Sequence, residues 1–249
     1  MRTSNRAVAI MTILRQYPIL LLASLGFVTC IGCTNSGFLP WKSTSPDSAE
    51  SGLATTGKSD GELPPKEAAR ACLVAAERMQ NGGQVQQAIL LYEKARKNDP
   101  GLKSIAHRLA VLYDIQGDSQ RSLSEYKLAV EAEPKNADVA SDLGYYYFER
   151  NNLGDAEREL RRALEIDPKH TKGLTNLGMV LAAEKHFDES FQIFSRAVGP
   201  AAAHSNLGVL LAKQGRNDEA RKEFHQALAI DPTLKQPQAF LEYLDGRRS

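Results

Sequence analysis

Hydrophobic, small and polar residues repeat with a fixed period over much of this 249-residue chain. Three prolines, Pro100, Pro134 and Pro168, are spaced 34 residues apart, and each follows an acidic residue. The pair Asp231-Pro232 occurs again further on. A constant period of this length predicts an array of equivalent supersecondary units, each of which stacks on its neighbours.

Large and small residues alternate at fixed places within each period. With each proline counted as position 32, positions 7, 11 and 24 are mostly large, whereas positions 8, 20 and 27 are small. Position 24 is Tyr92, Tyr126, Leu160, Phe194 and Phe224, and position 27 is Ala95, Ala129, Ala163, Ala197 and Ala227. Positions 4, 7, 8 and 11 share one face of a helix, and positions 20, 24 and 27 share one face of a second helix. Each unit is therefore predicted to be a hairpin of two closely packed amphipathic helices.

The residues between and after these helices fit the same prediction. Position 15 is Gly83, Gly117 and Gly215 in three units and Asn151 in another, as expected for a left-handed residue that ends the first helix. The proline at position 32 stops the second helix. One hairpin cannot bury its apolar face alone, so the hairpins must stack into a rod-like array.

This alternation resembles the tetratricopeptide-repeat family. The resemblance implies an all-α fold, a right-handed superhelical solenoid of helix-turn-helix hairpins over residues 65–249. Repeats are expected at about 69–102, 103–136, 137–170, 171–200 and 201–234, with a capping helix within 235–249. Members of the family bind other proteins or peptide segments, so the resemblance implies a protein-interaction scaffold and not an enzyme.

One repeat is four residues short. From Pro168 to Pro232 there are 64 residues, where two full periods would give 68. The deficit lies at Gly199-Pro200, so we expect the second helix of the fourth repeat to be about one turn short. The connection to the next hairpin should be abrupt, with Pro200 at the start of the next helix. Neutral drift and a local change of superhelical twist both remain open as explanations.

The N-terminal residues have the pattern of an export signal. Arg2, Arg6 and Arg15 precede an apolar run from Ile19 to Ile31, which is shorter than a membrane-spanning helix requires. The run ends in Cys30-Ile31-Gly32-Cys33, which resembles a bacterial lipobox. The resemblance implies a signal peptide at 1–32 and a lipid on Cys33, although Cys30 stands where leucine is usual. Other interpretations are plain cleavage, an uncleaved anchor, or a zinc or redox C-x-x-C motif, but no second ligand pair accompanies these cysteines.

A polar segment, residues 33–64, follows the lipobox. It is rich in Ser, Thr, Gly and Pro, and is predicted to be a flexible tether. Within it, Gly52–Ser59 matches the phosphate-binding pattern G-x-x-x-x-G-K-[ST]. That motif needs a strand before it and a helix after it. Here polar residues precede it, and Gly61, Pro64 and Pro65 follow, so a chance match is the preferred interpretation.

Composition and residue spacing argue against several classes of function. The formal net charge is +1, which gives no electrostatic argument for nucleic-acid binding. Three cysteines are too few for a disulfide framework, and Cys72 is predicted to be a buried core thiol. The five histidines have no metal-ligand spacing, and no nucleophile elbow is present. No catalytic residue, metal site or cofactor is predicted.

Family resemblance assigns first-helix positions 2, 5, 6, 9, 12 and 13 to the concave surface, the usual ligand groove. Asn176 and Asn206 offer amides that suit a peptide backbone, and Tyr145 with Phe148 offers aromatic anchors. A common family pattern and ordinary packing remain alternatives for these two pairs. Position 5 lacks the basic residues of a carboxylate clamp. The candidate groove residues are His107, Arg108, Val111, Asp114, Asp142, Tyr145, Phe148, Asn176, Met179, Asn206 and Val209.

The layout of the whole chain resembles two groups of bacterial lipoproteins, those of tight-adherence (Flp) pilus assembly and the type IV pilotins. This resemblance implies an exported scaffold in the cell envelope that is anchored to a membrane through lipid. Thr34 rather than aspartate after Cys33 favours the outer membrane. Competing hypotheses are a nucleotide-binding protein that uses Gly52–Ser59 and a purely structural envelope spacer. The sequence specifies neither the partner nor the oligomeric state.

Overall fold

The computed structural model describes residues 63–246, and all the helices and turns within that range build one solenoid. The expected all-α fold is confirmed. The signal, Cys33, most of the tether and Gly52–Ser59 lie outside the described residues. The five hairpins are α2 (Pro65–Asn81) with α3 (Val85–Asn98), α4 (Ala106–Gln116) with α5 (Ser119–Ala132), α6 (Ala137–Glu149) with α7 (Leu153–Ile166), α8 (Thr171–Ala183) with α9 (Phe187–Val198), and α10 (Pro200–Lys213) with α11 (Asn217–Ile230).

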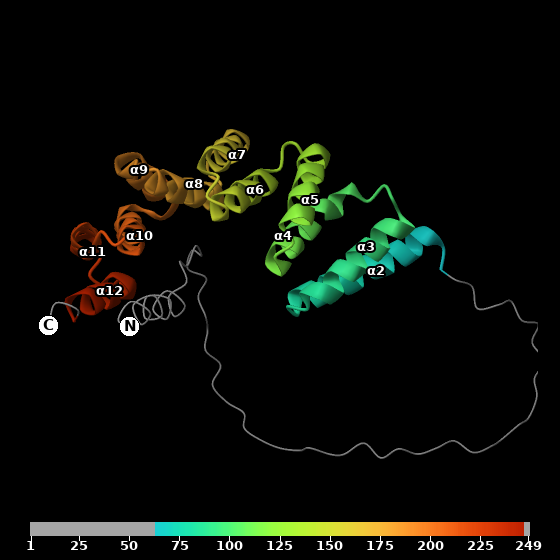
Figure 1. The fold of residues 1–249 in the computed structure, drawn as a ribbon, viewed down its shortest axis with the longest axis horizontal. Helices are drawn as coiled ribbons and strands as arrows, with labels where there is room; N and C mark the ends of the chain where they lie inside the picture. The colour runs from blue at the N-terminus through green and yellow to red at the C-terminus, as the bar shows by residue number, and fades with distance from the viewer. Residues whose placement is uncertain (1–62, 247–249) are drawn as a thin grey trace, which may run out of the picture.

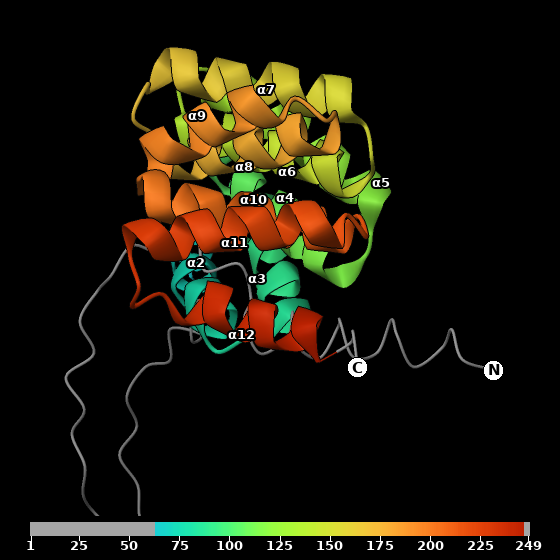
Figure 2. The same ribbon diagram turned by 90° about the vertical axis from the view of Figure 1, so that its left-hand side faces the viewer.

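The hairpins follow one another along an arc. Figure 1 shows α6, α8 and α10 on the inner side of the arc and α7, α9 and α11 on the outer side. In the view turned by a quarter, α7, α9 and α11 lie one below another (Figure 2). A short 3₁₀ turn, Lys103–Ile105, leads into α4, and α12 (Lys235–Asp245) follows the last hairpin. The inner surface of the arc is thus built from first helices, as the family pattern predicts.

The alternating large and small residues form the interior of each hairpin. Ala95, Ala163 and Ala227 are fully buried, and so are Phe194 and Phe224. A methyl group added at Gly178 or Gly208 would lie only 2.7 or 2.6 Å from the ring of Phe194 or Phe224, respectively. Glycine at position 8 therefore makes room for the large residue at position 24, and the two helices can approach closely.

The left-handed residues stand where the repeat pattern predicts them. Gly83, Gly117 and Gly215 have φ of 71°, 85° and 77°, and Asn151 has φ of 55°. The fourth repeat has Lys185 at this place, with φ of 68°. A lysine rarely adopts this conformation. The repeat geometry thus imposes the turn on a residue that does not favour it.

The shortened repeat differs from its siblings in both the helix and the connection. Helix α9 has 12 residues, whereas α3, α5, α7 and α11 have 14, so it is short by two residues and not by the full turn expected. A single residue, Gly199, joins α9 to α10, and its backbone has φ of 82° and ψ of 164°. Pro200 is the first residue of α10, as expected. Most of the deletion therefore falls on the connection.

Candidate protein-binding groove

The inner surface is closed over its C-terminal half. Thr175, Asn176 and Met179 on α8 are 0%, 3% and 7% exposed, and Val209 on α10 is 1% exposed. The amide of Gln214 donates a hydrogen bond of 3.1 Å to the Ala182 carbonyl, which ties α10 to α8. The one-residue connection at Gly199 joins α10 directly to α9, which pairs with α8 in the fourth hairpin. Little of Asn176, Met179 or Val209 is therefore open to a ligand.

Helix α12 extends this closure to the end of the array. The Ser205 hydroxyl donates a 2.9 Å hydrogen bond to Gln236 on α12. Met179, Val209 and Phe240 belong to one buried hydrophobic cluster, against which Phe148 also packs. Asn206 is partly exposed at this end. The buried Asn176 lies 3.4 Å from the Ser141 hydroxyl, to which its amide donates.

The N-terminal half of the inner surface is open. A cavity of about 470 Å³ lies between α2, α4 and α6. Its volume is in the range of ligand-binding pockets. Its walls carry donors, acceptors and one aliphatic side chain, and the lining residues are Gln80, Ser104, His107, Arg108, Val111, Glu133 and Asp142. Four predicted groove residues, His107, Arg108, Val111 and Asp142, therefore meet at one cavity.

A polar network crosses three first helices beside this cavity. A carboxylate can only accept hydrogen bonds, so His107 Nε2 on α4 donates to Asp142 Oδ2 on α6 at 2.9 Å. Lys172 on α8 forms an ion pair with the other carboxylate oxygen. Burial raises the pKa of Asp142, but the hydrogen bond from His107 and the charge of Lys172 outweigh it and lower the pKa overall. Asp142 is therefore held as a charged group that ties together repeats two to four.

Other groove charges are also paired. Arg108 on α4 lies 3.4 Å from Glu77 on α2, and both side chains are about half exposed. Asp114 accepts a 2.6 Å hydrogen bond from Arg150. Exposed pairs of this kind contribute little to stability. Arg108 and Glu77 can therefore exchange this contact for one with a ligand at little cost.

Apolar side chains border the open half. Tyr145 on α6 is 38% exposed, and its ring centroid lies 6.2 Å from that of Phe148. Burial and the Glu149 carboxylate raise the pKa of Tyr145 to about 12, so its hydroxyl stays neutral. Val74 and Ile115 are 53% and 65% exposed. They occupy positions 6 and 13 of their repeats, and sequence reasoning missed them, although apolar residues at these two groove positions were a usable signal.

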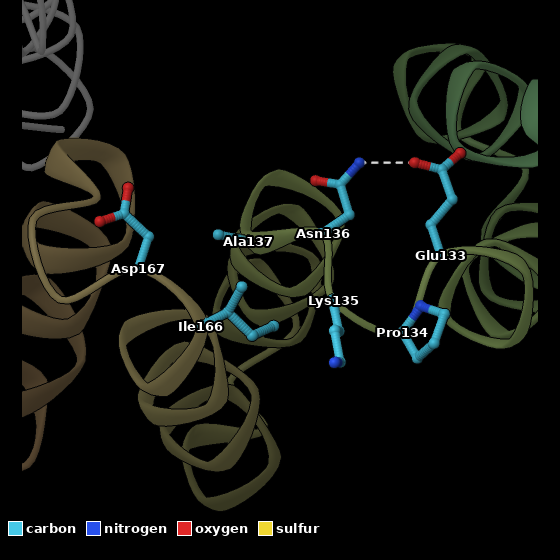
Figure 3. Close-up of a pocket in the computed structure, with 7 residues that line it drawn as sticks. All are labelled: Glu133, Pro134, Lys135, Asn136, Ala137, Ile166 and Asp167. Carbon is cyan, nitrogen blue, oxygen red and sulfur yellow. Dashed lines mark hydrogen bonds between the residues drawn. The ribbon is translucent and has the colours of Figure 1, made fainter.

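A second cavity lies where the third repeat begins (Figure 3), and Glu133 lines both this cavity and the one in the groove. Its volume is about 630 Å³, and its lining includes Lys135, Ile166 and Asp167. The amide of Asn136 donates to Glu133 at 2.6 Å, and Asn136 Oδ1 accepts from the first backbone amides of α6. These polar groups serve the turn and the start of α6. The second cavity therefore lies at the connection between the second and third repeats.

Two kinds of feature are absent from residues 63–246. No group of three or more His, Cys, Asp or Glu residues in this range could hold a metal ion. No helix in it is long and apolar enough to cross a membrane. Cys72 is buried, as expected for a core thiol. The open half of the inner surface therefore remains the candidate site.

Comparison with known proteins agrees with this geometry. The family model described as "Tetratricopeptide repeat" matches residues 201–234, and a second model with the same description matches residues 115–177. The chain is a tetratricopeptide-repeat protein. Such proteins bind other proteins or peptides, so the coarse prediction of a protein-interaction scaffold is supported. No match to a curated protein is found.

Solved structures of other repeat proteins share the fold. MamA is 22% identical and has a TM-score of 0.55, over 66% of this chain and 91% of MamA. YrrB, described as a TPR protein with an unusual peptide-binding site, is 21% identical with a TM-score of 0.54, over 70% of this chain and 92% of YrrB. PilF of Pseudomonas aeruginosa is 21% identical with a TM-score of 0.54, over 72% of this chain and 84% of PilF. At these identities the likeness is one of fold.

Proposed function

We propose that this tetratricopeptide-repeat protein is a scaffold of the bacterial cell envelope that holds a segment of a partner protein in the open half of its groove. The observation that carries the proposal is the cavity between α2, α4 and α6, together with the exposed side chains of Ile115 on α4 and Tyr145 on α6. A peptide is recognised through hydrogen bonds to its backbone and through pockets for its side chains. The cavity offers both kinds of contact.

The sequence supports the rest of the proposal. The lipobox-like Cys30–Cys33 and the Ser/Thr-rich residues 33–64 suggest a lipid anchor and a tether that together hold the solenoid near a membrane. A role in pilus or secretion-system assembly rests on the resemblance of the layout and on the shared fold of PilF. Thr34 favours the outer membrane. A purely structural spacer would need no accessible groove.

Photocrosslinking tests the groove. A photoreactive phenylalanine analogue is placed at Tyr145 of the full chain in its native host, and a second one is placed at Leu128 on α5. These side chains are similarly exposed, at 38% and 45%. Adducts with a discrete envelope protein are expected at 145 and not at 128. In a chain with Phe148→Ala and Arg108→Ala, the adduct at 145 should weaken because two groove contacts are missing.

Equal adduct formation at both positions, or no adduct at 145, would contradict the groove proposal. The anchor needs its own test, labelling with a palmitate analogue in the native host. Incorporation is expected in the natural chain and should be lost in Cys33→Ser, while Cys72→Ser should keep it because Cys72 is buried. Labelling that persists in Cys33→Ser would rule out the proposed anchor. ATP binding that is lost on Lys58→Ala would instead favour the nucleotide-binding alternative.

A further inference from the structure

One short segment of the tether differs from the rest in composition. Between Cys33 and Pro64 the chain is mostly Ser, Thr, Gly and charged residues, yet Phe38-Leu39-Pro40-Trp41 are consecutive apolar residues. Trp41 is the only tryptophan in the chain. Exposing a Phe, a Leu and a Trp to water is unfavourable by about 1.5–3 kcal/mol for each side chain that could otherwise be buried. A tether that served only as a spacer would not need this segment.

The open half of the groove offers apolar surface to match. The described residues expose seven large hydrophobic side chains, and three of them, Val74, Ile115 and Tyr145, lie on first helices α2, α4 and α6. Val111 lines the cavity that these helices enclose. Three first helices thus carry exposed apolar groups at positions 6, 13 and 9 of their repeats, and the same helices contribute the lining of a cavity large enough for an aromatic ring.

The distance between the segment and the groove is short. Residues 42–64 separate Trp41 from α2, and a polar coil of 23 residues has a mean end-to-end distance of about 25 Å. Helix α2 has 17 residues, which is about 25 Å in length, and Gln80 near its end lines the cavity. A linker of matching reach gives an effective concentration in the millimolar range. Weak intrinsic affinity therefore suffices for docking within the chain.

We propose that Phe38–Trp41 docks in the open half of the groove of the same chain, with Trp41 in the cavity between α2, α4 and α6. The inference rests on the proposed function in using the same groove. Pro40 restricts the backbone of the segment, which reduces the entropy lost on docking. A partner segment that binds in the same groove would then compete with it.

Intrinsic fluorescence tests this directly because Trp41 is the only tryptophan. The full chain in mild detergent is compared with the same chain in guanidinium chloride, through the emission maximum and quenching by acrylamide. In the natural chain, emission should be shifted to the blue and quenching should be severalfold weaker than in the denatured chain. Val74→Lys with Ile115→Lys should abolish both effects, since it places charges beside the docked ring.

The chain supplies a matched control. Leu90→Lys with Leu128→Lys changes two side chains on α3 and α5 that are 56% and 45% exposed, and it should leave the fluorescence of Trp41 unchanged. Three outcomes overturn the proposal. The first is a Trp41 that is exposed to solvent in the natural chain. The second is a protected signal that persists in the groove variant, which would mean that Trp41 is bound to detergent. The third is a protected signal that disappears on dilution, which would mean that the segment docks on a second copy of the chain.

The same material separates this inference from the proposed function. Trp41→Ser should increase the adduct at position 145 severalfold, because the competing segment is weakened. A solvent-like Trp41 together with a normal adduct at 145 would reject docking and leave the scaffold function standing. If Trp41 is protected in the natural chain and no adduct forms at position 145 in either the natural chain or Trp41→Ser, docking is supported and the partner-binding function is rejected.

Discussion

At the scale of single residues, Gly199 is the position where the shortened repeat depends most on one backbone conformation. Its φ of 82° and ψ of 164° lie in a region that is essentially restricted to glycine. No heavy atom lies within 4 Å of the place where a Cβ would stand. Gly199→Ala should therefore lower the free energy of unfolding by about 1–3 kcal/mol through backbone strain alone. The midpoint of urea denaturation, followed by circular dichroism, measures this.

Gly154→Ala is the matched control. Gly154 lies within α7 and also has open space around a Cβ, but its φ is not positive. Alanine there should raise stability by about 0.5–1 kcal/mol, because it favours the helix. If both variants shift the midpoint in the same direction, strain at Gly199 is not the cause.

Asp142 gives a prediction about pH. Its pKa is lower in the folded chain than in the unfolded one, so its pairing with His107 and Lys172 stabilises the fold above the ordinary carboxyl pKa of about 4. This stability is lost as the pH falls through the lowered pKa. Asp142→Asn should lower the free energy of unfolding by about 1–2 kcal/mol at pH 7. The difference in this free energy between the variant and the natural chain should shrink towards pH 3.

Asp138→Asn serves as the comparison, since Asp138 is also on α6 but its side chain is 66% exposed. It should change the free energy of unfolding by only a few tenths of a kcal/mol. Urea midpoints at pH 7 and pH 3 decide the matter. A loss at Asp142→Asn that is as large at pH 3 as at pH 7 would show that its charge is not the stabilising feature.

Residue types predicted the interior better than the groove. Alanine at position 27 and the rings at position 24 are fixed by contacts within one hairpin, so a pattern in the sequence suffices. Lys185 shows the limit of residue type, because its left-handed φ comes from the place it occupies in the repeat. The buried state of Asn176 and Met179 depends on how α10 and α12 close the array, which no local pattern encodes.

At the scale of elements, α12 stabilises the C-terminal end. Phe240 stacks on Phe224 of α11, with ring centroids 5.2 Å apart and an angle of 21° between the ring planes. Both rings are almost fully buried. Phe240→Ala should lower the free energy of unfolding by about 3 kcal/mol, because it removes this contact and leaves a cavity. Thermal unfolding followed by circular dichroism should show an earlier transition.

Glu242→Ala on the exposed side of α12 is the control, and it should have little effect. If α12 is a local cap, the loss of stability in Phe240→Ala should be confined to the C-terminal helices. Hydrogen exchange in Phe240→Ala should rise in α10, α11 and α12 and stay nearly unchanged in α2 and α3. Uniform acceleration along the array would mean that the solenoid unfolds as one unit and that α12 is not a local cap.

The prediction for the shortened repeat was correct for the connection, which is abrupt and has Pro200 at the start of α10, and was wrong only in expecting α9 to be a full turn short. Counting residues located the deletion at Gly199-Pro200, but it could not divide the loss between helix and connection. The structure assigns two residues to α9 and leaves one residue between α9 and α10. The other loss falls on the connection, which has one residue here and four residues between α5 and α6 and between α7 and α8.

At the scale of the whole molecule, stability depends on contacts between neighbouring repeats. A bidentate ion pair joins the first hairpin to the second. Arg96 on α3 donates hydrogen bonds of 2.6 and 2.7 Å to the two carboxylate oxygens of Glu125 on α5. Glu125 is 9% exposed. Arg96→Ala should leave it unpaired and weaken this junction by about 1–2 kcal/mol.

Hydrogen exchange with mass spectrometry measures the effect by segment. Amides of α2 and α3 should exchange roughly tenfold faster in Arg96→Ala, and those of α10 to α12 should be unchanged. Arg158→Ala on α7, where the arginine side chain is 62% exposed, should change little. Faster exchange confined to the C-terminal repeats would exclude the proposed role of Arg96.

The groove could be predicted only in part, because its accessibility is a property of the whole arc. Family positions located the inner face, and four of the predicted residues line one cavity. The network of His107, Asp142 and Lys172 requires the offset between successive repeats, which the period of 34 residues does not specify. The burial of the inner faces of α8 and α10 follows from the four-residue deletion at Gly199-Pro200 together with the capping helix α12. The sequence indicates the deletion and the capping helix, but it does not indicate their combined effect.

The single-residue connection at Gly199 also determines how the chain can be cut. A protease requires several residues of extended chain in its active site, and exposed loop tips usually provide them. Four residues, 133–136, separate α5 from α6, whereas α9 and α10 are separated by Gly199 alone. Limited digestion should therefore spare this junction. Helices α9 and α10 then remain on one fragment, and the site of the deletion becomes the most protease-resistant link between the described repeats.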